Sequence, residues 1–157
     1  MLKISKLSDY SLRLLSILSQ SHGLMSASLL ASSTGLGVST VRKLLKRLSQ
    51  AGIILSEMGL KGGYRLHQPL STITLADILK AIDGPLELTA CVNQSGWCAY
   101  KTCCNLQAPW HMVNEKINDL LAGISLDEMF ERTSTPRGVL VEDMVREHRS
   151  KRGNTHE

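Results

Sequence analysis

Aromatic side chains are scarce in this chain of 157 residues, because Phe, Trp and Tyr together make up only 4% of it. Proteins that bind single-stranded nucleic acids stack the bases on aromatic rings, so this scarcity argues against single strands as partners. No run of about 18 apolar residues is present, and a membrane-spanning helix is therefore not predicted. A glycine-rich phosphate loop and a convincing set of serine, histidine and aspartate are also absent, so we do not expect an enzyme.

A secretory signal peptide is not expected either. Charged residues at Lys3, Lys6, Asp9 and Arg13 interrupt the N-terminal apolar segment, and no small-residue cleavage site follows it. We therefore expect a reducing, cytoplasmic environment, where clustered cysteines more often bind a metal or carry out redox chemistry than form structural disulfides. Because 43% of the residues are hydrophobic, a chain of this length can form a core without disulfides.

A helix-turn-helix is predicted near the N-terminus. The first helix of the chain is expected to begin at Ser8, as its cap, and to bury a stripe of leucines. Residues 26–33 predict a short second helix, which Gly35 and Gly37 separate from a third helix in "STVRKLLKRLSQAG". The apolar residues of the third helix recur at the spacing of one helix face, and they are Val41, Leu44, Leu45 and Leu48. This pattern is typical of DNA-binding proteins in which the second of two short helices enters the major groove.

The next segment, "IILSEMGLKGGYRLHQP", predicts a β-hairpin, or wing, because two short apolar runs flank a tip rich in glycine. A further helix is predicted in "TITLADILKAIDGP", where Thr74 and Asp77 form a capping-box pair and Gly84 and Pro85 end the helix. The predicted fold class is therefore mainly α with a small β-hairpin, arranged as a winged helix-turn-helix domain.

Positive charge is concentrated on this predicted domain. Residues 40–65 contain six Lys or Arg side chains and only Glu57 as an acid, whereas the net charge of the whole chain is +4. A basic helix face is often merely solvated, but a helix-turn-helix followed by a basic wing favours binding to double-stranded DNA. Serine, threonine and lysine at the start of the third helix are expected to read bases, the other cations to bind phosphates, and Lys61 to reach the minor groove. The predicted DNA contacts are Ser39, Thr40, Arg42, Lys43, Lys46, Arg47, Lys61 and Arg65.

A long amphipathic helix is predicted in "PWHMVNEKINDLLAGI", with Pro109 as its first residue. Its apolar stripe has to be buried, and we favour burial against a second copy of the chain over burial against the first domain. Ser125 and Glu128 indicate a short additional helix. The expected division of the chain is a DNA-binding domain at 1–85, a cysteine-rich loop at 86–108, a dimerisation helix at 109–130 and a flexible tail at 131–157.

All four cysteines lie within residues 91–104, in a stretch without an acidic residue. Six residues separate Cys91 from Cys98, whereas four and five separate Cys98 from Cys103 and Cys104. Structural zinc usually takes two close pairs, and only one such short gap is present. Zinc, a redox-active thiol pair and inert thiols stay open as interpretations. Soft thiolates on an irregular loop favour an iron–sulfur cluster.

In combination, these motifs resemble the Rrf2 family of bacterial transcription regulators. The resemblance lies in "STVRKLLKRLSQAGI", the wing "GLKGGYRL", the segment "TLADILKAIDGP" and a three-cysteine loop before a long helix. The opening "MLKISKLSDY" and the cysteine spacing are most similar to the branch that regulates the SUF operon of iron–sulfur cluster assembly. The resemblance implies a DNA-binding homodimer that represses such genes and senses cluster status through a [2Fe–2S] or [4Fe–4S] cluster. A zinc or thiol-redox site in such a regulator is the alternative, and an iron–sulfur or thiol oxidoreductase is a further one.

The resemblance also implies a set of cluster ligands. These ligands are Cys91, Cys98, Cys104 and, as the fourth, Asp9 of the partner subunit. Cys103 is an alternative ligand, and His111 is a weaker candidate, because its helix neighbours suggest a surface residue. The histidine that some members use as the fourth ligand is replaced here by Gln107. Two DNA-contacting positions also depart from the family, since Lys43 stands in place of a glutamine and Met58 in place of a wing arginine. The operator of other members is therefore not expected to apply to this chain.

Overall fold

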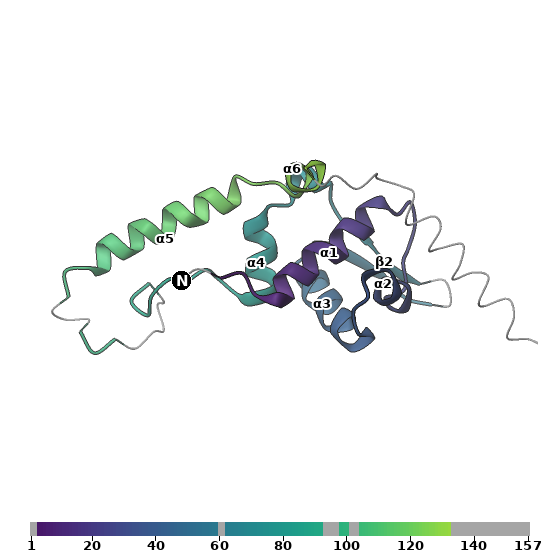
Figure 1. Ribbon diagram of the computed structural model, residues 1–157, viewed down its shortest axis with the longest axis horizontal. Coiled ribbons are helices and arrows are strands. Elements are labelled where there is room, and N and C mark those ends of the chain that lie inside the picture. Colours follow the sequence, from purple (N-terminus) through teal and green to yellow (C-terminus); the bar gives the residue numbers. More distant parts are fainter. Residues whose placement is uncertain (1–2, 60–61, 93–97, 101–103, 133–157) are drawn as a thin grey trace, which may run out of the picture.

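The computed structural model of the chain describes residues 3–59, 62–92, 98–100 and 104–132 (Figure 1). Its helices are α1 (Lys6–Gln20), α2 (Ala27–Thr34), α3 (Val38–Gln50), the short 3-10 helix η1 (Leu70–Thr72), α4 (Leu75–Asp83), α5 (Gln107–Ala122) and α6 (Leu126–Glu131). The strands β1 (Ile54–Glu57) and β2 (Gly63–Leu66) pair antiparallel. This arrangement confirms the predicted fold class, a mainly helical winged helix-turn-helix with one β-hairpin.

The N-cap of helix α1 lies three residues before the predicted cap. Ser5 has an extended backbone, and its Oγ accepts a hydrogen bond from the N–H of Ser8 at 3.1 Å, so Ser5 is the N-cap. Ser8 is already inside the first turn and is fully buried, and its hydroxyl donates to Oδ2 of Asp83 at 2.7 Å. The prediction that Ser8 caps the helix is therefore wrong, because this serine forms a tertiary contact with α4 instead.

The helix-turn-helix follows the sequence pattern closely. Ser26 caps α2, and Gly35 ends it with a φ of 71°, a left-handed conformation that glycine adopts without strain. Helix α3 begins after Gly37 and ends at Gln50, and Gly52 follows with a φ of 71°. The two helices pack against each other, which sets the orientation of α3 at the molecular surface.

One continuous hydrophobic core joins α1, α2, α3, α4, the base of the wing and α6. Its largest fully buried side chains include Leu14, Leu15, Leu30, Leu44, Leu45, Leu48, Ile54, Ile78 and Leu126. Burying a leucine or isoleucine side chain stabilises the fold by about 1.5–3 kcal/mol, so this cluster supplies most of the driving force for folding. The four apolar residues predicted to face inward from α3 are all in it.

The wing is attached to the segment between α1 and α2. In β1 and β2 the register runs from Ile54 opposite Leu66 to Glu57 opposite Gly63. Met25 forms an isolated bridge with Tyr64, in which the N–H of Met25 donates to the carbonyl of Tyr64 at 3.0 Å and the reverse bond measures 2.9 Å. Strand β2 is therefore held by backbone bonds on both of its sides, to β1 on one side and to Met25 on the other.

Helix α6, the last helix that the structure describes, packs into the same hydrophobic core. The N–H of Leu75 donates to the carbonyl of Ile124, and the N–H of Leu126 donates to the carbonyl of Ile73, both at 2.9 Å. Leu126 is fully buried in the core, where Phe130 joins it. Leu126 and Phe130 therefore lie in the same hydrophobic core as the residues of α1–α4.

Helix α5 leans away from the rest of the molecule (Figure 1). It begins at Gln107 rather than at Pro109, and Pro109 lies within the first turn, where its missing N–H costs no hydrogen bond. Asn114 is its only buried residue, whereas Trp110 and Leu120 are 39% and 66% exposed. In the part of the chain that the structure describes, no helix is long and apolar enough to cross a membrane.

Candidate nucleic-acid interface and cysteine segment

The exposed face of α3 is basic and lies opposite its buried face. Val41, Leu44, Leu45 and Leu48 are buried, whereas the exposed residues on the opposite side are Ser39, Arg42, Lys43, Lys46 and Gln50. These five follow one another at steps of three, one, three and four residues, which places them along one stripe of the helix. Thr40 is half-buried at the edge of this stripe. We call Ser39, Arg42, Lys43, Lys46 and Gln50 the α3 stripe; Gln50 is not among the DNA contacts predicted from the sequence.

The cations of the α3 stripe are available to a partner. Among the described residues, the ion pairs are Glu57 with Arg65 and Glu128 with Arg132, and neither involves α3. Arg42, Lys43 and Lys46 therefore have no acidic partner in the described part of the chain. Unpaired cations in a row are suited to a polyanion such as the phosphate backbone of DNA.

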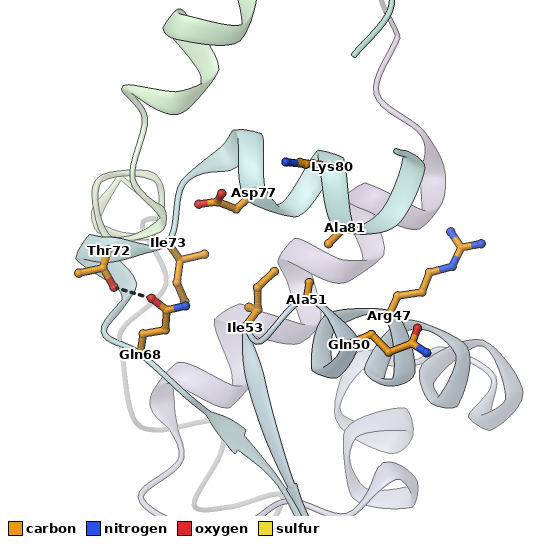
Figure 2. Close-up of a pocket in the computed structure, with 10 residues that line it drawn as sticks. All are labelled: Arg47, Gln50, Ala51, Ile53, Gln68, Thr72, Ile73, Asp77, Lys80 and Ala81. Carbon is orange, nitrogen blue, oxygen red and sulfur yellow. Dashed lines mark hydrogen bonds between the residues drawn. The ribbon is translucent and has the colours of Figure 1, made fainter. Parts of the chain in front are cut away.

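Arg47 behaves differently from its neighbours on α3. Its side chain is half-buried on the flank of the helix, and its guanidinium donates a hydrogen bond to the carbonyl of Ile82 in the last turn of α4. Figure 2 shows Arg47 beside a cleft between the end of α3 and α4. This cleft has a volume of about 610 Å³, and its other polar lining residues include Gln50, Gln68, Thr72, Asp77 and Lys80.

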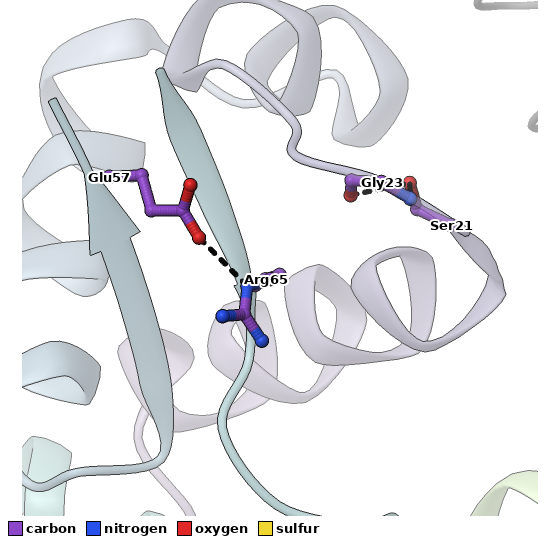
Figure 3. Close-up of polar contacts among 4 residues, drawn as sticks. All are labelled: Ser21, Gly23, Glu57 and Arg65. Carbon is purple, nitrogen blue, oxygen red and sulfur yellow. Dashed lines mark hydrogen bonds and ion pairs between the residues drawn. The ribbon is translucent and has the colours of Figure 1, made fainter. Parts of the chain in front are cut away.

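The wing carries one predicted DNA contact that has a partner. Arg65 Nε lies 3.0 Å from Oε1 of Glu57 on the paired strand, and both side chains are about half exposed (Figure 3). An ion pair this exposed contributes at most about 1 kcal/mol, so Arg65 can exchange Glu57 for a phosphate. At the tip, Met58 is completely exposed. Lys61 lies outside the described residues.

The turn before α2 lies close to the wing in the same view (Figure 3). The N–H of Gly23 donates to Oγ of Ser21 at 3.3 Å, and that hydroxyl donates to the carbonyl of Gly23 at 3.0 Å. These two bonds fix the turn that leads into Met25, to which β2 is bonded.

We call residues 91–105 the cysteine segment. Its described part has no helix or strand, as predicted. Cys91, Cys98 and Cys104 are free, half-buried thiols, and Cys103 lies outside the described residues. Oγ1 of Thr89 lies 3.0 Å from Sγ of Cys91, and the N–H of Leu106 donates to Sγ of Cys104 at 3.4 Å. Asp9 is exposed in the first turn of α1.

These donors do not converge on one point. Among the described residues, no three His, Cys, Asp or Glu side chains are close enough together to hold a metal ion. A cluster differs from a single ion in this respect, because its ligands are distributed over two or four iron atoms. Three thiols, two of which already have a hydroxyl or N–H group near the sulfur, are a suitable donor set for such a cluster.

A second cleft, of about 590 Å³, opens at the start of α5. Its lining residues are Cys104, Asn105, Gln107, Ala108, His111, Met112 and Glu115. His111 is half-buried and shares this cleft with Cys104, which the sequence prediction of a surface histidine did not anticipate.

Solved structures support the fold. The chain is similar to CymR, described as the global cysteine regulator of B. subtilis, with a TM-score of 0.62 and 25% identity over 85% of this chain and all of that one. Its fold is also similar to that of IscR from T. potens, with a TM-score of 0.59, 24% identity and coverage of 85% of this chain and 93% of the other. Both likenesses extend well beyond the helix-turn-helix.

Sequence comparison leads to the same group of proteins. The HTH-type transcriptional regulator IscR of Photorhabdus laumondii is 32% identical over 95 residues, which are 60% of this chain. The match spans 57% of that relative, so it covers little more than half of its length. The profile of the Rrf2 family, described as iron-dependent transcriptional regulators, matches residues 4–132. The chain therefore belongs to the Rrf2 family, whose members are transcriptional regulators and not enzymes.

Proposed function

We propose that the protein is a dimeric transcriptional regulator that binds double-stranded DNA through α3 and the wing. The observation that carries this proposal is that α3 has an apolar, buried face and, opposite it, a basic, exposed face. Four buried apolar residues fix the helix to the core, and the α3 stripe turns three unpaired cations outward. A helix held in this way can enter the major groove as a rigid element.

The residues of the interface have different roles in this proposal. Ser39, Thr40 and Lys43 lie in the first two turns of α3, where side chains reach base edges, so they contribute specificity. Arg42 and Lys46 bind phosphates and contribute affinity that depends on salt. Lys61 and Arg65 extend the contact from the wing to the adjacent minor groove.

Salt dependence separates these roles experimentally. A duplex is first selected from genomic fragments by the wild-type protein, and its affinity is then measured at several salt concentrations. We expect Lys46→Ala to weaken binding to every duplex and to reduce the salt slope by about one unit, whereas Ser39→Ala relaxes sequence preference at an unchanged slope. Arg13→Ala, on an exposed position of α1, is the matched control. If Arg13→Ala and Lys46→Ala had the same effect, α3 would not be the interface.

Dimerisation is proposed to occur through α5. This helix exposes Trp110 and Leu120 in the single chain, and only Asn114 on it is buried, so its apolar stripe is only partly covered. A two-fold dimer places two copies of α3 on one side of a duplex, where half-sites are about 34–36 Å apart. Sedimentation equilibrium at micromolar concentration is expected to give twice the mass of the chain. A monomeric mass at every concentration would contradict this part of the proposal.

The cysteine segment is proposed to hold an iron–sulfur cluster, [2Fe–2S] or [4Fe–4S], whose presence reports the supply of such clusters. The ligands are Cys91, Cys98 and Cys104, with the fourth supplied by Asp9 of the partner subunit and with Cys103 as the alternative thiol. The described thiols, the hydrogen-bond donors near two of them and the family's description as iron-dependent support this choice. When bound, such a group supplies a redox-active, labile centre. The regulated genes are proposed to be those of iron–sulfur cluster assembly, including a SUF operon, under repression.

Elemental analysis tests the cofactor. Protein purified without oxygen should contain iron and acid-labile sulfide in equal amounts and should be brown. Cys98→Ala should lose both the iron and the sulfide, whereas the midpoint of thermal unfolding of the α1–α4 domain should stay unchanged. Zinc without sulfide in the wild-type protein would overturn the cluster and favour a structural zinc site.

A further inference from the structure

The last turn of α4 is held by two other helices. The carbonyl of Ile82 accepts the hydrogen bond of Arg47 from α3. The two carboxylate oxygens of Asp83 accept hydrogen bonds from α1, at 2.8 Å from Oγ of Ser5 and at 2.7 Å from Oγ of Ser8. The end of α4 is thus connected directly both to the N-terminus of α1 and to the DNA-binding helix.

This turn is also the point where the chain leaves the domain. Gly84 ends α4 with a φ of 93°, a conformation that L side chains rarely adopt, and the chain then leads towards the cysteine segment. A few residues later, the N–H of Leu88 donates to Oδ1 of the buried Asn114 on α5 at 3.2 Å. Any displacement of the segment that follows Gly84 therefore acts on α4 at the residues that Arg47, Ser5 and Ser8 hold.

The geometry of Arg47 is suited to fixing one helix to another. Carbonyls in the last turn of a helix have no partner within the helix and carry its negative end, so a guanidinium is a favourable donor there. Its neighbour Lys46 is exposed, belongs to the α3 stripe and has no ion pair in the described residues. The two adjacent cations of α3 therefore face different surroundings, one the solvent and the other α4.

We propose that Arg47 is a positioning residue that connects the cysteine segment to the DNA-binding helix and does not bind phosphate. Its hydrogen bond to Ile82 makes the orientation of α3 depend on the position of the last turn of α4, and that position depends on the cysteine segment. This inference rests on the proposed function, because it requires that the cysteine segment has two states. It reassigns one of the residues that the sequence placed among the DNA contacts.

The test compares Arg47→Met with Lys46→Met as its matched control. Affinity for the selected duplex is measured for the iron-loaded protein and for the protein after removal of iron with a chelator, at several salt concentrations. Lys46→Met should weaken both states equally and reduce the salt slope by about one unit. Arg47→Met should leave the salt slope unchanged and reduce the ratio of the two affinities by at least about fivefold. Arg47→Lys, which keeps a donor, should restore part of that ratio.

Two outcomes would overturn the role proposed for Arg47 and leave the proposed sensing function intact. One is a salt slope that falls by one unit in Arg47→Met, since that would make Arg47 a phosphate contact. The other is an unchanged affinity ratio in Arg47→Met when the wild-type affinities differ. Equal affinities of the two wild-type states would instead contradict the proposed sensing function and the connecting role together. Thermal unfolding checks the fold. Ser8→Ala removes one of the two hydrogen bonds that hold Asp83 to the start of α1, and it provides a second variant in which the affinity ratio should fall at an unchanged salt slope.

Discussion

Replacing Gly63 with alanine should detach the wing from the body of the domain. A Cβ at this position would lie 2.8 Å from the carbonyl oxygen of Met25 and 2.9 Å from its carbonyl carbon, both of them backbone atoms. Side chains can rotate away from a new methyl group, but backbone cannot, so residues 24–26 and β2 have to separate. Glycine is thus required at position 63 because the backbone of Met25 lies so close to it, although the sequence around Gly63 suggested a glycine of the turn.

The structure sets the size of the effect. Separation breaks the two hydrogen bonds between Met25 and Tyr64, which measure 3.0 and 2.9 Å, and each contributes about 1 kcal/mol. Met25 is fully buried, so its side chain also loses part of its packing. We expect the free energy of unfolding to fall by about 2–3 kcal/mol, and the midpoint of thermal unfolding by roughly 6–12 °C.

Urea denaturation and amide hydrogen exchange measure this prediction. The amide of Tyr64 should lose protection, and affinity for the selected duplex should fall because the wing is displaced. Gly35→Ala is the control, since Gly35 has open space around it and a φ of 71°, so alanine there costs about 1 kcal/mol of backbone strain and leaves the wing attached. A change below about 0.5 kcal/mol in Gly63→Ala would refute the reasoning, because the contact with Met25 would then be dispensable.

Three further predictions concern other parts of the chain. Thr74→Ala removes the capping box of α4 and should lower the free energy of unfolding by about 1 kcal/mol, as measured by urea denaturation. Leu120→Glu places a charge on the exposed apolar face of α5 and should shift the sedimentation mass to that of a monomer, with the domain still folded. Glu57→Gln removes the partner of Arg65 and should raise both duplex affinity and the salt slope, whereas a fall in affinity would mean that Glu57 positions the wing for DNA.

The winged helix was predictable from local signals. The apolar spacing of α3, the capping pair of Thr74 and Asp77, and the glycines after α2 and α3 act within a few residues of one another. Each of these signals is a property of one segment, so the pattern of residues determines it directly. The boundaries of α2, α3 and α4, the hairpin and the buried face of α3 therefore agree closely with the expectations, whereas the starts of α1 and α5 do not.

The tertiary contacts were not predictable in the same way. The hydrogen bond of Arg47 was not foreseeable, because its partner, the carbonyl of Ile82, is a backbone atom 35 residues away and leaves no mark in the sequence. Ser8 resembled a cap for the same reason, since its partner Asp83 is 75 residues away. The return of α6 into the core depends on the direction in which α5 leaves it, which composition and periodicity do not encode.

Control of DNA binding by the cysteine segment is the part of the proposed function on which the role of Arg47 also depends. This control is tested by the equilibrium affinity of anaerobically purified protein for the selected duplex, measured by fluorescence anisotropy before and after chelation of iron. We predict affinities that differ by at least about tenfold, and no such difference in Cys98→Ala. Equal affinities before and after chelation, in protein shown to contain iron and sulfide, would contradict the account.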